Sequence, residues 1–449
     1  MTTRASAREA RSASHPVAVI GAGYVGLPTA ATLSHFGHRV VLAEREEGRL
    51  AALRSGRMPI VEVGLDDLVA GGVGAGNLRF CASAAEAVVG AAFVFLCVPT
   101  PQGADGSADL SYVEAAAKEI GSHLESGAIV VNKSTVPVGS ATMVEQVIGR
   151  PDIRVVSNPE FLREGTAVAD SLHPDRIVVG ADDSQAAARV AELFSSTGAP
   201  LIVTDATTSE TIKYASNAFL ATKLSFVNAL AAVCEEVGAD VRDVMLGLGY
   251  DKRIGFEFLR PGPGWGGSCL PKDTRALLHI ASEAGYDFSL LAGAIASNEQ
   301  QLARVVAKVE AACGGSLDGV TVGVWGLTFK ANTDDRRDSP GVQIAHRMRG
   351  LGARVQAFDP TVAGHPGDEV PDELVPDDLR GFTLRADPYE AASGASVVVV
   401  LTEWDEFRWL DYSRLLPLMH QPFIIDARNL LDPAAVRRLG FTYAGIGRQ

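Results

Sequence analysis

The feature that most constrains the fold is a series of short, uninterrupted apolar runs separated by stretches with helical periodicity. Runs that are apolar throughout are typical of strands covered on both faces, and their alternation with helices indicates a parallel, doubly wound sheet. Five such runs occur in the first half of the chain, at 17–20, 39–43, 93–98, 128–131 and 176–179. We therefore expect an α/β domain of the Rossmann type over residues 15–205.

The last third of the chain repeats this pattern. Apolar runs occur at 320–326, 354–359, 396–401 and 423–426. The first of these ends in a glycine and the second in an acid, as their counterparts near the N-terminus do. The repetition predicts a second Rossmann-like, doubly wound domain over residues 313–449.

Between the two patterns the chain has helical periodicity. From Thr207 to Val237 the apolar residues recur at intervals of three, four or seven, which predicts one long helix. Thr207 and Glu210 have the spacing of a capping box, and Gly238 is a natural stop. A helix of this length is typical of a spine or a dimer contact, so we expect residues 206–312 to form a central helical, dimerising domain.

Composition and charge limit the function classes. The 449 residues correspond to about three usual domains, and the net charge is 40 − 54 = −14. This charge argues against nucleic acid or an anionic membrane as the main partner. Five widely spaced cysteines indicate a reducing compartment, and no uninterrupted apolar run reaches the roughly 18 residues of a membrane span. We expect a cytoplasmic protein whose residues 1–14 form a disordered tail.

A glycine-rich turn follows the first predicted strand. Gly21, Gly23 and Gly26 have the spacing of a dinucleotide-binding loop at the start of a helix, where backbone N–H groups can face a pyrophosphate. Glu44, at the end of the second predicted strand, is placed to bind ribose hydroxyls and to repel a 2′-phosphate. The neighbouring Arg45 is compatible with NADP as well, but NAD is the expected cofactor.

Cys269 is the candidate nucleophile. It follows a segment with four glycines, residues 262–268, and directly precedes a predicted helix that begins near Pro271. The helix N-terminus and the nearby Lys272 both favour the thiolate form. The other four cysteines, Cys81, Cys97, Cys234 and Cys313, lie in or beside apolar segments and are expected to be core residues.

A dinucleotide site together with a nucleophilic thiol suggests oxidation of an alcohol to an acid. The step from aldehyde to acid uses a thiohemiacetal, and the resulting thioester must be hydrolysed. Lys213 and Asn217 lie one helical turn apart and are candidates for a base and an oxyanion donor, although for such a pair taken by itself a solvated helix face is the better explanation. Further candidates are the carboxylates Asp273, Glu160 and Glu164, for which a plain helix face is the alternative.

The chain resembles the nucleotide-sugar 6-dehydrogenases, the family of UDP-glucose and GDP-mannose dehydrogenases. The matching segments are GAGYVGL (21–27), VPTP (98–101), KSTVPVG (133–139), NPEFLREG (158–165), PDR (174–176), KYASNAFLATK (213–223), residues 262–273, GLTFKANTDDRRDSP (326–340) and DARN (426–429). The resemblance covers Val17 to about Leu430, and it is nearest to the members that oxidise UDP-glucose.

The resemblance implies two NAD-dependent oxidations at C6 of UDP-glucose, which yield UDP-glucuronate. It implies Cys269 as the nucleophile, Lys213 and Asn217 for proton transfer and for holding the C6 oxygen, and Asp273, Glu164 and Thr135 beside them. The implied NAD contacts are Gly21, Gly23, Tyr24, Val25, Gly26, Glu44, Arg49, Thr100, Thr135 and Arg337. The implied nucleotide-sugar contacts are Glu160, Phe161, Leu162, Arg163, Glu164, Lys213, Asn217, Arg253, Phe258, Leu259, Arg260, Gly264, Gly266, Lys330 and Arg428. A homodimer built on the central helix is implied, with Arg260 near the neighbouring subunit, and no metal is expected.

Several alternatives stay open at this point. Val63, Ala229 and Trp265 depart from the family's usual residues, which leaves the sugar open to GDP-mannose or another nucleotide sugar. Ser268 and Lys272 argue against the dehydrogenases of UDP-N-acetylhexosamines. Outside this family, the alternatives are a two-electron hydroxyacid dehydrogenase in which Cys269 is structural, and a non-catalytic scaffold.

Overall fold

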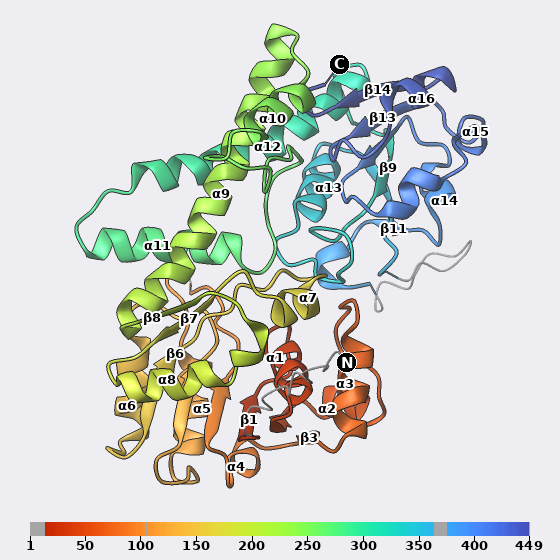
Figure 1. Ribbon diagram of the computed structural model, residues 1–449. Helices are drawn as coiled ribbons and strands as arrows, with labels where there is room; N and C mark the ends of the chain where they lie inside the picture. Colours follow the sequence, from red (N-terminus) through yellow and green to blue (C-terminus); the bar gives the residue numbers. More distant parts are fainter. Residues whose placement is uncertain (1–13, 104–105, 363–374, 449) are drawn as a thin grey trace, which may run out of the picture. The chain divides into compact units, whose positions relative to one another are not determined.

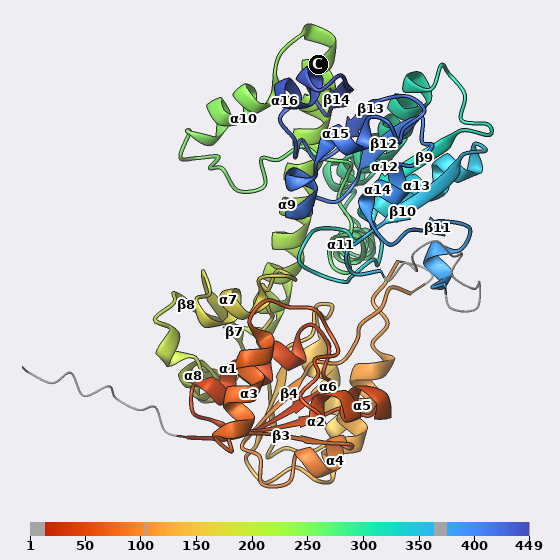
Figure 2. The same ribbon diagram turned by 90° about the vertical axis from the view of Figure 1, so that its right-hand side faces the viewer.

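The computed structural model describes residues 14–103, 106–362 and 375–448. The tail predicted at residues 1–14 therefore lies, except for Ser14, outside the described residues. The chain divides into two compact units, Met1–Ala215 and Ser216–Gln449, and the division into three domains stays a prediction. Helix α9 (Ala206–Val237) crosses the division, and Figures 1 and 2 show it as one continuous helix.

The first unit is built on an eight-stranded sheet with the order β3-β2-β1-β4-β5-β6-β7-β8 (Figure 1). The strands are β1 (Pro16–Ile20), β2 (Arg39–Ala43), β3 (Leu78–Cys81), β4 (Phe93–Leu96), β5 (Ile129–Asn132), β6 (Arg154–Ser157), β7 (Ile177–Gly180) and β8 (Leu201–Thr204). All five predicted strands are confirmed. The additional strand β3 has Arg79 inside it, β6 has only two apolar residues between Arg154 and Ser157, and β8 is an exposed edge strand.

One junction in this sheet is antiparallel, contrary to the expected parallel arrangement. Strands β6 and β7 meet through Ser157 and Gly180, whereas the other neighbouring pairs run parallel. Gly180 also packs against the start of α9, since a Cβ there would meet the Asp205 carbonyl oxygen at 2.5 Å. A continuous apolar run predicts a buried strand but carries no information about its direction.

Helices cover both faces of this sheet, which confirms the doubly wound prediction. One face packs on α1 (Gly26–His35), α3 (Leu65–Gly74), α7 (Ala167–Leu172) and α8 (Ser184–Glu192). The other face packs on α4 (Ala84–Ala87), α5 (Ser111–Gly121) and α6 (Ser140–Ile148). The remaining elements are α2 (Glu47–Arg54) and a short 3-10 helix, η1 (Ser195–Thr197).

The second unit contains a six-stranded parallel sheet with the order β11-β10-β9-β12-β13-β14. Its strands are β9 (Thr321–Trp325), β10 (Arg354–Phe358), β11 (Thr383–Leu384), β12 (Val397–Val400), β13 (Phe423–Asp426) and β14 (Thr442–Gly445). The four apolar runs of the last third therefore form the predicted Rossmann-like sheet, and β11 and β14 extend it at the two edges.

Helices also cover both faces of the second sheet. One face packs on α9, α10 (Val241–Gly249), α12 (Ser289–Ala312) and α13 (Pro340–Gly350). The other face packs on α14 (Pro388–Ala392), η4 (Asp405–Trp409), α15 (Tyr412–Leu415) and α16 (Pro433–Arg438) around the fully buried Trp325. The unit also contains α11 (Leu270–Glu283), which follows Cys269, and the short 3-10 helix η3 (Asp377–Leu379).

Helix α9 has the predicted length, but its start differs from the prediction. Asp205 accepts a hydrogen bond from the Thr208 N–H at 2.7 Å and so caps the helix. Glu210 does not take part, because its carboxylate binds the N–H groups of Gly139 and Ala141 at the start of α6. The capping-box prediction is therefore wrong, since a tertiary contact claims the side chain.

The mean hydropathy of α9 is also higher than the sequence analysis implied. By length and composition the helix is apolar enough to cross a membrane, although Lys213 and Lys223 interrupt its apolar run. Of its most apolar window, 44% is buried inside the protein. Long core helices meet the same criterion, so hydropathy by itself assigns α9 no membrane role.

Candidate functional site

The glycine loop between β1 and α1 has the close backbone packing that a dinucleotide-binding turn requires. Gly21 has a φ of +100°, and a Cβ there would meet the Cys97 carbonyl oxygen at 2.7 Å. A Cβ on Gly26 would collide with the Gly21 carbonyl oxygen, whereas Gly23 has no atom within 4 Å of its Cβ position. A phosphate could therefore approach the backbone at Gly23. The loop is completed by Ala22, Tyr24 and Val25.

Glu44 lies at the carboxyl end of β2 and contacts this loop. Its carboxylate accepts hydrogen bonds from the Ala22 N–H at 3.2 Å and from the Glu46 N–H at 2.9 Å. In this position an acid can accept hydrogen bonds from ribose hydroxyls and disfavours a 2′-phosphate. Arg49, also predicted here, is exposed and lies 3.6 Å from the Glu46 carboxylate.

Thr100 and Thr135 lie at the carboxyl ends of β4 and β5, which are neighbours in the sheet. The Thr100 hydroxyl donates to the Thr135 carbonyl oxygen at 2.9 Å, and both side chains are buried. The structure thus brings these two predicted residues together. Ligands of open α/β sheets bind at the carboxyl ends of the strands, which is the edge on which both threonines lie.

Glu160 and Lys213 form a buried ion pair within the first unit. The Lys213 ammonium lies 2.8 Å from the Glu160 carboxylate, and each side chain is only 4% exposed. Burial opposes ionisation of Glu160, but the charge of Lys213 and the hydrogen bonds from Lys213 and the Leu162 N–H hold its pKa below the usual value. The Phe161 ring covers this pair, with the Lys213 ammonium 5.4 Å from its centroid and the Arg176 guanidinium at 3.5 Å.

A second buried lysine supports the same region, and the sequence analysis did not single it out. Lys133 donates to the Asn158 amide oxygen at 3.0 Å, and Asn158 donates in turn to the Val178 carbonyl oxygen at 2.7 Å. Burial lowers the pKa of Lys133 to about 8, against the opposing attraction of the Glu160 carboxylate. These bonds join the segments that follow β5 and β6 to strand β7. Both residues belong to segments that the resemblance includes, KSTVPVG and NPEFLREG, so the signal was present.

The segment after Glu160 is held by side chains on two sides. Arg163 forms a bidentate pair with Asp170, at 2.6 Å and 3.1 Å, and Glu164 is half-buried. Glu62, buried to 6% exposure, accepts hydrogen bonds from the Gly165 N–H at 2.7 Å and the Ala167 N–H at 2.8 Å. Glu62 therefore fixes the turn that carries Glu164, a role that nothing in its local pattern predicts.

Glu210 connects α9 to the loop that carries Thr135. Its carboxylate accepts hydrogen bonds from the Gly139 N–H at 2.7 Å and the Ala141 N–H at 3.0 Å. Burial raises the pKa of Glu210 to about 7, although these two hydrogen bonds oppose the shift. Lys213 lies one turn further along the same helix, so Glu210 fixes the position of that turn of α9.

The raised pKa of Glu210 makes the stability of the protein depend on pH. Between pH 4.5, the ordinary pKa of a glutamate, and about pH 7, the folded protein retains a proton that the unfolded chain has lost. The contribution of this carboxyl group to the free energy of unfolding is therefore complete below pH 4.5 and is lost as the pH rises through 7. The free energy of unfolding of the wild-type protein should fall by about 1–3 kcal/mol across this pH window, and we expect no such fall for Glu210→Gln. Urea unfolding of both proteins between pH 4.5 and 8 measures it. Parallel stability curves for the two proteins would contradict the assignment.

Within the second unit, Cys269 lies where the predicted helix begins. It is the N-cap residue of α11, is partly exposed, and its Sγ lies 3.5 Å from the Ser268 hydroxyl. One turn further on, Asp273 is fully buried and accepts from Lys272 at 2.6 Å and from the Asn217 amide at 2.5 Å. The structure thus brings Asn217 and Asp273 together at the start of the helix that follows the thiol.

The other cysteines fit their predicted core role, with one exception. Cys81, Cys97 and Cys234 are buried, whereas Cys313 at the end of α12 is partly exposed. Burial raises the pKa of Cys97 to about 12, which keeps this thiol protonated. All five cysteines are free thiols.

Arg428 holds a turn of the second unit in place. Its guanidinium donates to the Leu401 carbonyl oxygen at 2.8 Å and to the Phe329 carbonyl oxygen at 2.7 Å. A Cβ on Gly262 would lie 3.6 Å from the same guanidinium, so Arg428 reaches the start of the glycine-rich segment. Lys330 follows Phe329 and lies over its ring at 5.3 Å. Arg428 also pairs with the Glu403 carboxylate at 3.0 Å. Lys330 and Arg428 therefore lie in one region after β9 and β12, together with an acidic side chain.

The remaining predicted residues occupy three different settings. Phe258 has a φ of +60°, Leu259 is buried, and Arg260 is exposed in the connection between α10 and α11. Arg253 pairs with Asp251 at 2.6 Å and is 88% exposed. Arg337, predicted to bind the cofactor, lies in the second unit and pairs with Asp335 at 2.7 Å.

Gly264 and Gly266 lie in the segment before Cys269, where a Cβ on Gly266 would collide with the Asp338 carbonyl oxygen. Among the described residues, no group of three or more His, Cys, Asp or Glu side chains is placed to hold a metal ion.

Comparison with known proteins identifies the family along nearly the whole chain. Residues 15–197 match the NAD binding domain of the UDP-glucose/GDP-mannose dehydrogenase family, residues 207–300 its central domain and residues 323–433 its UDP binding domain. The glycine loop and Glu44 fall in the NAD binding domain, and Lys330 and Arg428 fall in the UDP binding domain. The NAD cofactor predicted from the loop is thereby confirmed.

Curated relatives and solved structures agree with this assignment. The chain is 46% identical to UDP-glucose 6-dehydrogenase of Rhizobium meliloti (strain 1021), over 96% of this chain and 99% of that protein. It is 42% identical to UDP-glucose 6-dehydrogenase of Pseudomonas aeruginosa, over 96% and 97%. A UDP-glucose dehydrogenase structure from Pyrobaculum islandicum matches with a TM-score of 0.87 and 35% identity, over 98% of this chain and 99% of that chain. The protein is an NAD-dependent oxidoreductase that belongs to the UDP-glucose/GDP-mannose dehydrogenase family.

Proposed function

We propose that the protein oxidises UDP-glucose at C6 to UDP-glucuronate in two NAD-dependent steps. The relatives at 46% and 42% identity are UDP-glucose 6-dehydrogenases, which supports UDP-glucose as the substrate. The observation that carries the four-electron reaction is the partly exposed Cys269 thiol at the N-terminus of α11, one turn before buried Asp273.

The cofactor would be held by the chain's glycine loop and by Glu44. Gly21 and Gly26 allow the close packing of the turn, Gly23 leaves the backbone open to a pyrophosphate, and Glu44 would accept hydrogen bonds from a ribose. NAD supplies the hydride acceptor for both oxidations. The remaining proposed contacts are Tyr24, Val25, Arg49, Thr100, Thr135 and Arg337.

The chemical steps at C6 of the substrate define the roles that we propose for the side chains. In the first oxidation the C6 alcohol loses its hydroxyl proton and a hydride from C6, and becomes an aldehyde. Lys213 is the proposed base, which requires that its ammonium first release a proton from the ion pair with Glu160. The Cys269 thiolate then adds to the aldehyde carbon, and Asn217 donates a hydrogen bond to the C6 oxygen. The second oxidation converts this thiohemiacetal to a thioester. Water then cleaves the carbon–sulfur bond, which releases the carboxylate and regenerates the Cys269 thiolate.

Other residues support these groups in the proposal. Asp273 holds Asn217, Glu160 holds Lys213 as a buried ion pair, and Glu164 serves the hydrolytic water. Lys330 and Arg428 supply positive charge for the diphosphate. The other proposed sugar-nucleotide contacts are Phe161, Leu162, Arg163, Arg253, Phe258, Leu259, Arg260, Gly264 and Gly266, and Thr135 is proposed to lie at the reacting centre.

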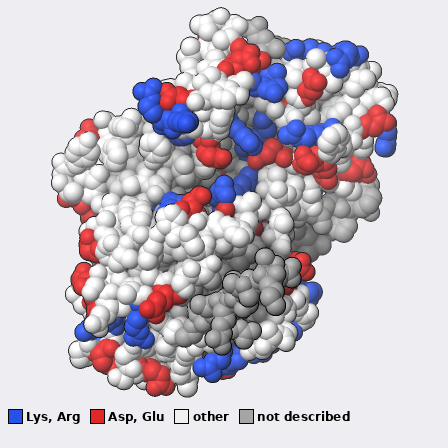
Figure 3. All heavy atoms as spheres, viewed as in Figure 1, with Lys and Arg blue, Asp and Glu red and all other residues white. Residues whose placement is uncertain are grey.

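We also infer a cytoplasmic homodimer without nucleic-acid or membrane partners. Four apolar side chains on one stripe of α9 are more than half exposed, namely Phe219, Phe226, Val233 and Val237. Burying this stripe against a second copy would remove it from water. Acidic and basic side chains lie interspersed on the face shown in Figure 3, and the net charge is −14, which supports small anionic substrates over polyanions. Sedimentation equilibrium measures the oligomeric state.

The yield of NADH per sugar tests the proposed reaction. We expect two NADH for each UDP-glucose consumed, because the alcohol must lose four electrons to become an acid. Purified protein, excess NAD and limiting UDP-glucose give this ratio at completion, with GDP-mannose and UDP-N-acetylglucosamine in parallel. A ratio of one would mean that oxidation stops at the aldehyde, and turnover of GDP-mannose alone would move the assignment to the other substrate of the family.

A further inference from the structure

The segment before Cys269 contains little that could fix its own conformation. Residues 262–268 include four glycines, and Gly264 and Gly267 have φ angles of +133° and +84°. Glycine has the widest conformational freedom of all residues, so this backbone needs tertiary contacts to hold a single shape. The position of the Cys269 thiol depends on these contacts, because Cys269 directly follows the segment.

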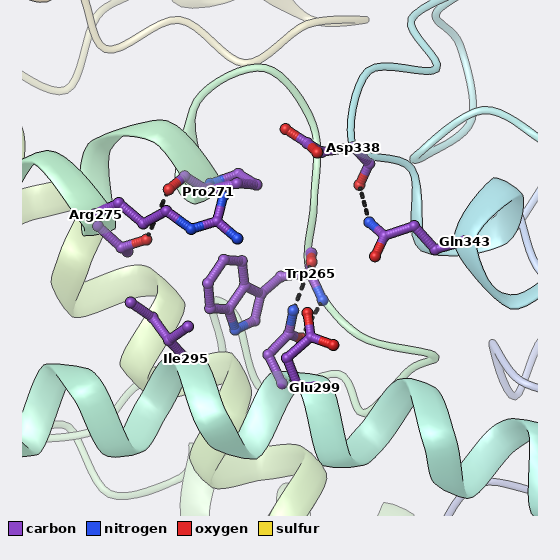
Figure 4. A pocket seen from close by; sticks show the side chains of 9 residues that line it. Trp265, Pro271, Arg275, Ile295, Glu299, Asp338 and Gln343 are labelled. Carbon is purple, nitrogen blue, oxygen red and sulfur yellow. Dashed lines mark hydrogen bonds between the residues drawn. The ribbon is translucent and has the colours of Figure 1, made fainter. Parts of the chain in front are cut away.

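Asn298 on α12 makes the most specific of these contacts. Its amide oxygen accepts from the Trp265 N–H at 2.8 Å, and its amide nitrogen donates to the Trp265 carbonyl oxygen at 2.9 Å. Figure 4 draws both bonds as dashed lines beside Trp265. The amide oxygen and the amide nitrogen of Asn298 thus bind the N–H and the C=O of one residue, as the backbone of a neighbouring β-strand would. Asn298 is only 6% exposed, so water does not compete strongly for these bonds.

Further contacts hold the segment at neighbouring points. Gly262 donates its N–H to the Asn228 amide oxygen at 2.8 Å and accepts from the Gln301 amide at 2.7 Å. The Trp265 indole N–H donates to the Ser225 hydroxyl at 2.9 Å. Helices α9 and α12 therefore fix Gly262 and Trp265, while further along the segment Gly266 packs against Asp338 and Gly267 against Phe329.

The packing around Asn298 is close on the side of Gly264. A Cβ on Gly264 would lie 3.0 Å from the Asn298 amide oxygen and 3.1 Å from Leu302. Beyond Trp265 a small polar pocket opens, lined among others by Arg275, Glu299 and Gln343 (Figure 4). Without the two amide bonds, the Trp265 backbone could move toward this pocket while its buried N–H and C=O lost their partners.

We propose that Asn298 is a positioning residue for Cys269, and that it sets the conformation of residues 265–268 through its two bonds to Trp265. The proposal deepens the proposed function, since it assumes that Cys269 is the reacting thiol. Asn298 itself touches no reacting atom. Its removal should therefore slow the chemistry and change the reactivity of the thiol, with little change in the affinity for substrate.

The test compares Asn298→Ala and Asn298→Asp in a Cys313→Ser background, which removes the other partly exposed thiol. The aspartate keeps the acceptor for the Trp265 N–H but places an oxygen against the Trp265 carbonyl. Gln300→Ala is the matched control, because Gln300 is an exposed amide on the same helix. Two readouts are measured in each protein: kcat and KM with UDP-glucose, and the rate of Cys269 alkylation by iodoacetamide from pH 5 to 9.

We expect Asn298→Ala to lower kcat about 10–100-fold with a change in KM below about threefold, as a small misplacement of a reacting group does. Its alkylation profile should move toward that of an unperturbed thiol, with Asn298→Asp intermediate and Gln300→Ala unchanged. A variant with a lower melting temperature but wild-type kcat and alkylation would reduce Asn298 to a structural role and overturn the proposal. A higher KM at constant kcat would overturn it as well.

The two readouts separate this proposal from the proposed function. If the parent protein fails to turn over UDP-glucose, the proposed function fails, whereas the alkylation profile still reports whether Asn298 controls the thiol. If Asn298→Ala does not fold, Asn298→Asp supplies the comparison, since it has the same shape and retains one of the two bonds.

Discussion

Replacement of Cys269 by alanine is expected to lower turnover of UDP-glucose by at least about 10³-fold, with NAD binding unchanged. The thiol is the group that converts the aldehyde into a species able to lose a second hydride, and no other partly exposed cysteine lies at a helix N-terminus. Residual oxidation should therefore yield at most one NADH per sugar. Fluorescence titration of NADH checks that the glycine loop of the first unit still binds the cofactor.

Cys313→Ala is the matched control for this experiment. Cys313 is also partly exposed, but it lies at the C-terminal end of α12, and burial raises its pKa. We expect this variant to yield two NADH per UDP-glucose at the wild-type rate. Two NADH per sugar from Cys269→Ala would instead assign Cys269 a structural role, as a two-electron dehydrogenase would require.

Replacement of Glu160 by alanine is expected to lower the free energy of unfolding by about 3–5 kcal/mol, because it leaves a buried charge without its partner. Lys213 is paired with Glu160 at 2.8 Å and is almost fully buried. Lys133, also buried, is attracted by Glu160 and repelled by Lys213. Removing the carboxylate therefore leaves two lysines that repel each other away from water. Chemical unfolding at pH 7 measures the loss.

Two further variants test whether this loss comes from the unpaired lysine. Glu160→Ala combined with Lys213→Met should be more stable than Glu160→Ala alone, because the second change removes the buried charge. Glu114→Ala is the control, since Glu114 pairs with Lys118 at 2.7 Å on an exposed helix face and should cost less than about 1 kcal/mol. Equal losses for Glu160→Ala and Glu114→Ala would refute the buried-pair explanation.

Local patterns in the sequence predicted the elements that repeat over several residues. The apolar run at 39–43 is strand β2 with the same bounds, the run at 354–359 is β10 to within one residue, and the periodicity from Thr207 corresponds to α9. The glycine spacing at Gly21 predicted the cofactor site because close backbone approach excludes a Cβ there, as the packing against Cys97 shows. These features are short-range, so their signal lies within a few consecutive residues.

Side chains that act through distant partners were not predictable in this way. Glu210 has capping-box spacing from Thr207 and yet binds α6, 71 residues away from Gly139 in sequence. Asn298 lies in a helix among ordinary polar residues, and only its partner Trp265, 33 residues away, gives it a role. The antiparallel pairing of β7 with β6 could not be predicted either, because the apolar run of β7 does not show the direction of its neighbour.

The sequence by itself determined the fold class, the family, the cofactor and the candidate nucleophile. Each of these depends on residues that are close in the chain: strand followed by glycine turn, or glycine segment followed by Cys269 and a helix. Only the tertiary structure decided which side chains hold these groups in place, such as Glu160 against Lys213 and Asn298 against Trp265. The physical reason is that burial and hydrogen-bond pairing arise from packing between distant segments, and a polar residue in a helix has the same local pattern whether it faces water or a partner.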